Sequence, residues 1–124
     1  MKASDLFVKC LEEEGVTRIF GVPGEENADF MISLKQSKKI EFILCRHEQA
    51  AAFMADAYGR LTGKAGVCLS TLGPGVTNLM TGLADANMDR SPVVAIIGQG
   101  STNRLHKESH QIMDSISMVH PISK

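Results

Sequence analysis

The sequence predicts an α/β domain in which a parallel sheet carries helices on both faces. Strand-like apolar runs alternate with helix-like segments four times, and the runs begin near residues 17, 40, 65 and 92. Regular alternation of this kind is typical of βα units joined by right-handed crossovers. The run PVVAIIG at 92–98 is apolar throughout, which predicts a strand buried on both of its faces.

Composition and charge exclude several classes of function. The 124 residues, with a net charge of -1, are expected to form one domain, 1–124. A charge so close to neutral leaves no electrostatic footprint for nucleic acid or an anionic membrane. The chain has no apolar run near the ~18 residues of a membrane span, and its acidic N-terminal segment does not resemble a signal peptide.

Cysteine and histidine positions predict neither a disulfide framework nor a metal site. Cys10, Cys45 and Cys68 occur singly inside predicted helices or strands, so they are interpreted as small buried hydrophobic residues of a cytoplasmic protein. The four histidines, at 47, 106, 110 and 120, are scattered without a carboxylate at ligand spacing.

The N-terminal half is expected to contain two helices and two strands. Ser4 is a suitable N-cap for the first helix, and Gly15 suits the left-handed position beyond its end. Pro23-Gly24 forms a turn that closes the first strand. The predicted elements are the helix 4–14, the strand 17–22, a helix from 26 or 27 to about 37, and the strand 40–45.

The C-terminal half repeats this pattern. Gly63 ends a long helix, and the turn Leu72-Gly73-Pro74-Gly75 leads into the next one. Beyond Gly100 the chain becomes polar and is expected to form a loop with one short helix. The predicted elements are the helix 47–62, the strand 65–71, the helix 76–88, the strand 92–98 and a short helix near 111–118.

Glu48 is the lone acid at the carboxyl edge of this predicted sheet. Ligands of parallel sheets bind beyond the carboxyl ends of the strands. The other three corners at that edge, 23–24, 71–75 and 99–100, all contain glycine, which allows a ligand to approach the backbone closely. Two interpretations of Glu48 remain open here, a cap on the first turn of its helix and a functional carboxylate.

The glycine-rich turn at 73–75 matches neither of the common nucleotide fingerprints. It lacks the pattern GxGxxG of dinucleotide-binding domains and the pattern GxxxxGK[ST] of nucleoside triphosphate loops. A structural βα turn and a phosphate loop both remain open. A nucleotide-binding Rossmann domain is disfavoured, and a hydrolase is too because Ser70 lacks the GxSxG elbow.

Four motifs in a fixed order identify a family resemblance. They are GVPGEEN at 21–27, RHEQAAAFMADAYGRLTGKAGV at 46–67, TLGPGVTN at 71–78 and SPVVAIIGQ at 91–99. Together they resemble the N-terminal pyrimidine-binding domain of thiamine-diphosphate-dependent enzymes of the acetolactate synthase and pyruvate oxidase group. The run HKESHQIMDSISMVHPISK at 106–124 looks most like the acetolactate synthase branch, particularly its catabolic members.

The resemblance implies roles for the residues that match the family motifs. Glu48 matches the glutamate that hydrogen-bonds N1′ of the cofactor's aminopyrimidine. Sharing a proton there favours the imino tautomer, whose nitrogen takes the C2 proton of the thiazolium. The remaining matches are the loop near the pyrimidine (Val22, Pro23 and Gly24), further positions of the cofactor pocket (Thr71, Pro74 and Asn78) and a substrate-side pair (His110 and Gln111).

The resemblance also implies parts that this sequence does not contain. Family members bind Mg²⁺ and the diphosphate through a C-terminal domain, and their cofactor lies between two subunits of a dimer or tetramer. FAD, where present, docks on those other domains. The chain is therefore expected to hold half a site and to be inactive alone, as a shortened form, a fragment or a split subunit.

Two functions of different classes are carried forward. The first is the pyrimidine-binding domain of an acetolactate synthase-like carboligase acting on a 2-oxo acid such as pyruvate. A pyruvate oxidase, a decarboxylase or another carboligase remains open within that class. The second is a non-catalytic dimerisation module that pairs through the apolar helix segment 50–57.

Overall fold

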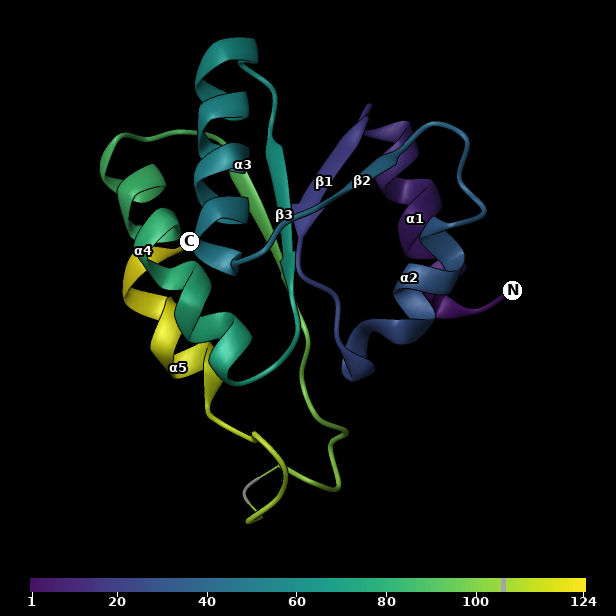
Figure 1. Cartoon of the computed structure of the whole chain (residues 1–124), viewed down its shortest axis with the longest axis vertical. Coiled ribbons are helices and arrows are strands. Elements are labelled where there is room, and N and C mark those ends of the chain that lie inside the picture. Colours follow the sequence, from purple (N-terminus) through teal and green to yellow (C-terminus); the bar gives the residue numbers. More distant parts are fainter. Residues whose placement is uncertain (106) are drawn as a thin grey trace.

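The computed structural model describes residues 1–105 and 107–124 and confirms the predicted α/β fold (Figure 1). Its parallel sheet has four strands in the order β2-β1-β3-β4. The strands are β1 (Arg18–Gly21), β2 (Glu41–Leu44), β3 (Gly66–Ser70) and β4 (Val93–Ile97). Across the described residues, no helix is both long enough and apolar enough to traverse a lipid bilayer. His106, one of the scattered histidines, lies outside the described residues.

Helices cover both faces of the sheet, as predicted. In Figure 1, α1 (Ala3–Glu13) and α2 (Ala28–Leu34) lie on one side, whereas α3 (Glu48–Thr62) and α4 (Pro74–Met88) lie on the other. The short helix α5 (Ser115–Val119) lies beside α4. Two 3₁₀ turns, η1 (Glu25–Asn27) and η2 (His120–Ile122), complete the elements of the described residues.

The central strand β3 contributes to the cores on both faces because its side chains alternate. Val67 and Leu69 belong to the cluster under α1 and α2, and Cys68 belongs to the cluster under α3 and α4. All five residues of β3 are buried. The first cluster also holds Val8, Leu11, Ile19, Phe30, Leu34 and Ile40, and the second holds Cys45, Ala51, Ala52, Ala55 and Leu79.

Small residues bring α3 unusually close to its neighbours. A Cβ atom added to Gly66 of β3 would lie 1.9 Å from the carbonyl oxygen of Ala55. On α4, a Cβ atom on Gly82 would lie 2.6 Å from the Cβ atom of Ala52. The alanine-rich sequence of α3 is therefore a packing requirement, because larger side chains on this face would push the helix away from β3 and α4.

The prediction that strand β4 is buried on both faces is wrong. The apolar run at 92–98 was expected to be buried on both faces, yet Val94 is 43% exposed. The reason is its position, because β4 is the edge strand of the described sheet and pairs only with β3 on one side. Cys10 was likewise expected to be buried but is exposed, while Cys45 and Cys68 are buried and all three thiols are free.

Some helix ends also differ from the predicted ones. The first helix begins at Ala3 with Lys2 at the N-cap position, instead of at a Ser4 cap. The second ends at Leu34, three residues before the predicted end. The last helix begins at Ser115 instead of near 111, because the carboxylate of Asp114 accepts a hydrogen bond from the backbone N–H of Ser117 at 3.0 Å and caps it.

Replacing Gly66 with alanine should separate crowding from backbone strain. We expect Gly66→Ala to lower the free energy of unfolding by about 3 kcal/mol, because rigid backbone surrounds the added methyl group. The matched control is Gly15→Ala, where φ is +77° and no atom lies within 4 Å of the added Cβ. That variant should lose only about 1 kcal/mol, from backbone conformation alone. Urea unfolding followed by circular dichroism measures both, and equal losses would contradict the packing explanation.

A cluster of charged residues ties α3 to the C-terminal part of α4. Arg60 donates to the Asp56 carboxylate through Nε at 2.9 Å and through a terminal nitrogen at 2.7 Å. It also bonds Asp85 at 2.9 Å and pairs with Asp89. The Asp56 side chain is only 5% exposed, and the Arg60 guanidinium holds the pKa of this carboxyl below its usual range.

This cluster predicts a specific dependence of stability on pH. The pKa of Asp56 is lower in the folded chain than in the unfolded chain. Its contribution to the free energy of unfolding is therefore fully present when the pH is above the pKa of an unfolded aspartate. That contribution is lost as the pH falls through the folded-state pKa. Arg60→Gln should therefore destabilise the chain at neutral pH and much less in strong acid. A series of urea midpoints from about pH 7 down to about pH 2 tests this, and a loss that stays constant across the series would contradict the ion-pair account.

Candidate functional site

The carboxyl ends of the four strands meet at one edge of the sheet, as predicted. Gly21 at the end of β1 pairs with Leu44 of β2 and Leu69 of β3, and Leu69 pairs with Ile96 of β4. In Figure 1, the connections that follow β1, β3 and β4 all leave the sheet at its lower end. The predicted site residues therefore come to one edge of the fold, which is where parallel sheets bind ligands.

Glu48 is the first residue of α3 and is buried at this edge. Only 8% of the residue is exposed, and its Oε2 atom accepts a hydrogen bond of 2.9 Å from Nδ2 of Asn78 on α4. These two predicted site residues are 30 positions apart in the sequence. The side-chain cap of α3 comes instead from His47, whose Nδ1 accepts from the backbone N–H of Gln49 at 3.1 Å. The capping interpretation of Glu48 is thus not needed to explain the helix start.

Thr71 lies at the centre of the predicted glycine corners. A Cβ atom on Gly24 would lie 2.5 Å from both Cβ and Oγ1 of Thr71, so the loop after β1 rests directly against this side chain. A Cβ atom on Gly75 would lie 3.2 Å from Cγ2 of Thr71 and 3.4 Å from Oε1 of Glu48. Gly98, after β4, packs against the backbone of Thr71 and Leu72. Glycine is therefore required at this edge for close packing of the turns.

The loop after β1 is held by a residue that the sequence interpretation missed. Oδ1 of Asn27 accepts a hydrogen bond from the backbone N–H of Gly24 at 2.8 Å. Asn27 is buried, and its Nδ2 atom has no hydrogen-bond partner among the described residues. Val22 packs against the second core cluster, and Pro23 is exposed. The asparagine three residues after a turn glycine is the only local signal for this contact.

Pro74 and the substrate-side pair, His110 and Gln111, are exposed to solvent. Pro74 is exposed at the first position of α4, where a missing N–H costs nothing. Gln111 is exposed and has a positive φ of 53°, and its carbonyl oxygen lies 2.5 Å from the Cβ position of Gly73. His110 is exposed beside it. Among the described residues, hydrogen bonds connect neither of these two side chains to Glu48.

The polar loop after β4 is tied to the loop after β1. A guanidinium nitrogen of Arg104 lies 3.7 Å from Oε1 of Glu26, and Nε of Arg104 donates to Ser109 at 3.1 Å. Ile112 packs against Gly100, where a Cβ atom would meet its Cδ1 atom. These contacts hold the segment that carries His110 and Gln111 at the same edge as Glu48.

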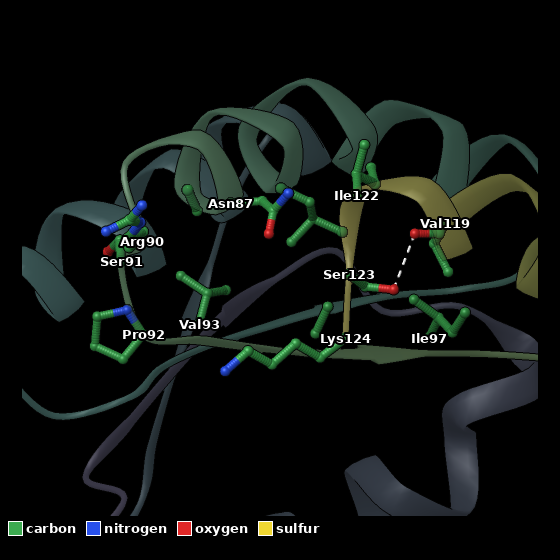
Figure 2. A pocket seen from close by; sticks show the side chains of 13 residues that line it. Asn87, Arg90, Ser91, Pro92, Val93, Ile97, Val119, Ile122, Ser123 and Lys124 are labelled. Carbon is green, nitrogen blue, oxygen red and sulfur yellow. Dashed lines mark hydrogen bonds between the residues drawn. The ribbon is translucent and has the colours of Figure 1, made fainter.

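A cavity of about 840 Å³ lies elsewhere, between α4, β4 and the C-terminal residues (Figure 2). Figure 2 shows Asn87 and Arg90 of the α4 region above it and Val93 and Lys124 below, with Ser123 donating a hydrogen bond to the carbonyl of Val119 at 2.9 Å. Neither Glu48 nor Thr71 nor Asn78 lines this cavity. This cavity and the residues proposed from the sequence for the site are therefore separate features.

A parallel α/β domain with a buried carboxylate among close-packed glycine turns defines a class of protein that binds its ligand at the carboxyl edge of the sheet. The family model "Thiamine pyrophosphate enzyme, N-terminal TPP binding domain" matches residues 1–118. The chain belongs to this family of thiamine-diphosphate-binding domains.

Curated relatives agree with the family. An acetolactate synthase of Bacillus subtilis is 48% identical over 123 residues, which are 99% of this chain and 21% of that protein. A probable acetolactate synthase large subunit of Methanocaldococcus jannaschii is 47% identical over 124 residues, 100% of this chain and 21% of that protein. A catabolic acetolactate synthase of Raoultella terrigena is 48% identical over 121 residues, 98% of this chain and 22% of that protein. The chain thus spans about a fifth of the length of these relatives.

The contact between Gly24 and Thr71 can be tested by adding a methyl group at position 24 with and without the Thr71 side chain. We expect Gly24→Ala to lower the free energy of unfolding by about 2 kcal/mol, because the new methyl group overlaps Thr71. In a Thr71→Gly background the same change should cost less than about 0.5 kcal/mol, since the obstructing side chain is absent. Urea unfolding of the four proteins measures this coupling. An equal cost in both backgrounds would contradict the contact.

Proposed function

We propose that this chain binds the aminopyrimidine half of thiamine diphosphate and that Glu48 is its catalytic carboxylate. The single observation that carries the proposal is the burial of the Glu48 carboxylate and its hydrogen bonding. It is a buried acid with one oxygen bonded to Asn78 and the other beside Gly75, at the ligand-binding edge of the sheet, in a chain of the thiamine-diphosphate family. A buried carboxylate suits a ring nitrogen with which it shares a proton.

The residues at this edge fit such a ring. Gly24 and Gly75 both pack against the Thr71 side chain, which brings these turns and the Glu48 carboxylate together at one edge of the sheet. We propose that Val22, Pro23 and Gly24 pack near the ring and that Thr71, Pro74 and Asn78 complete the pocket. Glu48 would hold the proton shared with N1′. When bound, thiamine diphosphate supplies the electron sink that stabilises a carbanion next to a former carbonyl carbon.

The whole protein is proposed to be an acetolactate synthase-like carboligase. The names of relatives up to 48% identical over nearly the whole chain support this reaction. In it, a 2-oxo acid such as pyruvate is decarboxylated and joined to a second molecule to give 2-acetolactate. His110 and Gln111, on the loop held beside the sheet edge, are proposed to face that substrate.

Other parts of the proposed enzyme lie outside this chain. Because the chain spans about a fifth of its relatives, we propose that it is one domain, 1–124, and that Mg²⁺ and the diphosphate bind to another. Alone it would then hold half a site. We leave open whether the whole enzyme also uses FAD, and we retain homo-oligomerisation as its assembly. A cytoplasmic location is also proposed, although plant relatives are named chloroplastic.

A second candidate function is favoured by the outer face of α3. Its residues Ala50, Phe53, Met54, Ala57 and Leu61 are all exposed and recur at helical spacing. Such an apolar stripe is typical of a helix that is covered by a partner. A non-catalytic dimerisation module would explain the stripe but not the buried Glu48. Pairing through this face is compatible with both candidates. Within the thiamine-diphosphate class, a pyruvate oxidase or a decarboxylase remains the alternative chemistry.

Glu48→Gln is the decisive substitution. In the complete protein that contains this chain, we expect it to lower 2-acetolactate formation at least about 100-fold, because the amide cannot exchange the proton. The matched control is Glu41→Gln, the same chemical change on an exposed side chain of β2, which should leave activity intact. Calorimetry with thiamine diphosphate and Mg²⁺ should show binding by the complete protein and little by this chain alone.

The outcomes separate the candidates. Unchanged activity in Glu48→Gln would overturn the catalytic assignment. Absence of thiamine diphosphate binding by the complete protein would overturn the whole proposal and leave the dimerisation module.

A further inference from the structure

The two carboxylate oxygens of Glu48 have different surroundings. Oε2 accepts the hydrogen bond of 2.9 Å from Nδ2 of Asn78. Oε1 lies 3.4 Å from the position that a Cβ atom on Gly75 would take, one turn before Asn78 on α4. Within the described part of the chain, Oε1 has no hydrogen-bond donor. The protein therefore donates a hydrogen bond to one oxygen, and the other oxygen lies beside Gly75 without a donor among the described residues.

The chemistry of the Asn78 amide makes this difference permanent. A side-chain amide donates through N–H but neither gains nor loses a proton in the range where proteins are folded. Oε2 therefore remains an acceptor, whatever happens at Oε1. An aspartate at position 78 would instead place a second negative charge next to Glu48, and two carboxylates so close disfavour ionisation of one of them. A serine would be too short to span the same gap between the helices.

The geometry of this pair is also fixed by rigid elements. Asn78 lies in the second turn of α4, and Glu48 begins α3. The two helices approach closely where Gly82 meets Ala52, and Gly82 lies four positions after Asn78, about one helical turn. Groups held by packed helices keep their positions better than groups on loops, so the amide can set the plane of the carboxylate.

We propose that Asn78 is a positioning residue that occupies Oε2 and thereby makes Oε1 the oxygen presented to the ring nitrogen of the cofactor, with no side chain at Gly75 to cover it. This inference rests on the function proposed above for Glu48. It adds that the carboxylate is asymmetric and that a neutral amide on α4 enforces the asymmetry.

The test measures thiamine diphosphate binding in the presence of Mg²⁺ by calorimetry, in the complete protein that contains this chain. Asn78→Ala should weaken binding about tenfold, because a hydrogen bond to a charged group is lost. In a Glu48→Ala background the same change should alter binding less than about twofold, because Asn78 acts only through Glu48. Asn78→Asp, of the same size, should weaken binding at least as much as Asn78→Ala. The matched control is Asn87→Ala, an exposed asparagine on the same helix, which should bind normally.

A second measurement uses this chain alone and needs no cofactor. The side-chain amide resonance of Asn78 should shift in the NMR spectrum of Glu48→Ala, and that of Asn87 should not. Gly75→Ala should leave the Asn78 resonance in place but weaken thiamine diphosphate binding in the complete protein, because the methyl group covers Oε1 and spares Oε2. Together the two results distinguish the oxygen that is bonded to Asn78 from the oxygen proposed to face the cofactor.

Failure of the inference differs from failure of the proposed function. If Glu48→Ala weakens thiamine diphosphate binding while Asn78→Ala binds normally, or if the two losses simply add, Asn78 does not act through Glu48 and the inference is wrong. If Glu48→Ala binds thiamine diphosphate as well as the unmodified protein does, the proposed function of Glu48 falls, and the inference falls with it.

Discussion

The site depends on how deeply α3 is buried. Ala52 and Ala55 are fully buried, and the backbone of Ala55 approaches Gly66 of β3 so closely that no other residue fits there. A helix held this firmly along its middle has little freedom at its first residue, which is Glu48. The position of the carboxylate therefore follows from glycine and alanine contacts several residues away, and a substitution among them would move the site without touching it.

Two helix N-termini converge on the same edge because the strands are parallel. Both α3 and α4 follow strands whose carboxyl ends lie there, so Glu48 and Pro74 begin their helices side by side with the glycine turns. The partial positive charge of a helix N-terminus favours a carboxylate nearby. This arrangement helps to explain how an acid with so little exposure to water is accommodated, with Asn78 supplying the one direct hydrogen bond.

The alternation of apolar runs and glycine turns was sufficient to predict the α/β class, both helical layers and the edge at which Glu48 lies. The contacts made across the fold were not predictable in the same way. The bond between Glu48 and Asn78 joins residues far apart in sequence, and the Gly24 contact of Asn27 depends on the shape of one loop. The exposure of Val94 depends on which strand lies at the sheet edge, and an apolar sequence does not contain that information.

The same helix connects the proposed chemistry with the proposed assembly. One side of α3 is packed against β3 and α4, and the other carries the exposed stripe with Phe53 and Met54, only five or six residues from Glu48. Glu48 belongs to the packed side together with Ala52 and Ala55. The surface that a partner would cover and the carboxylate proposed for the chemistry are therefore opposite sides of one rigid helix, and the packing that fixes one of them fixes the other.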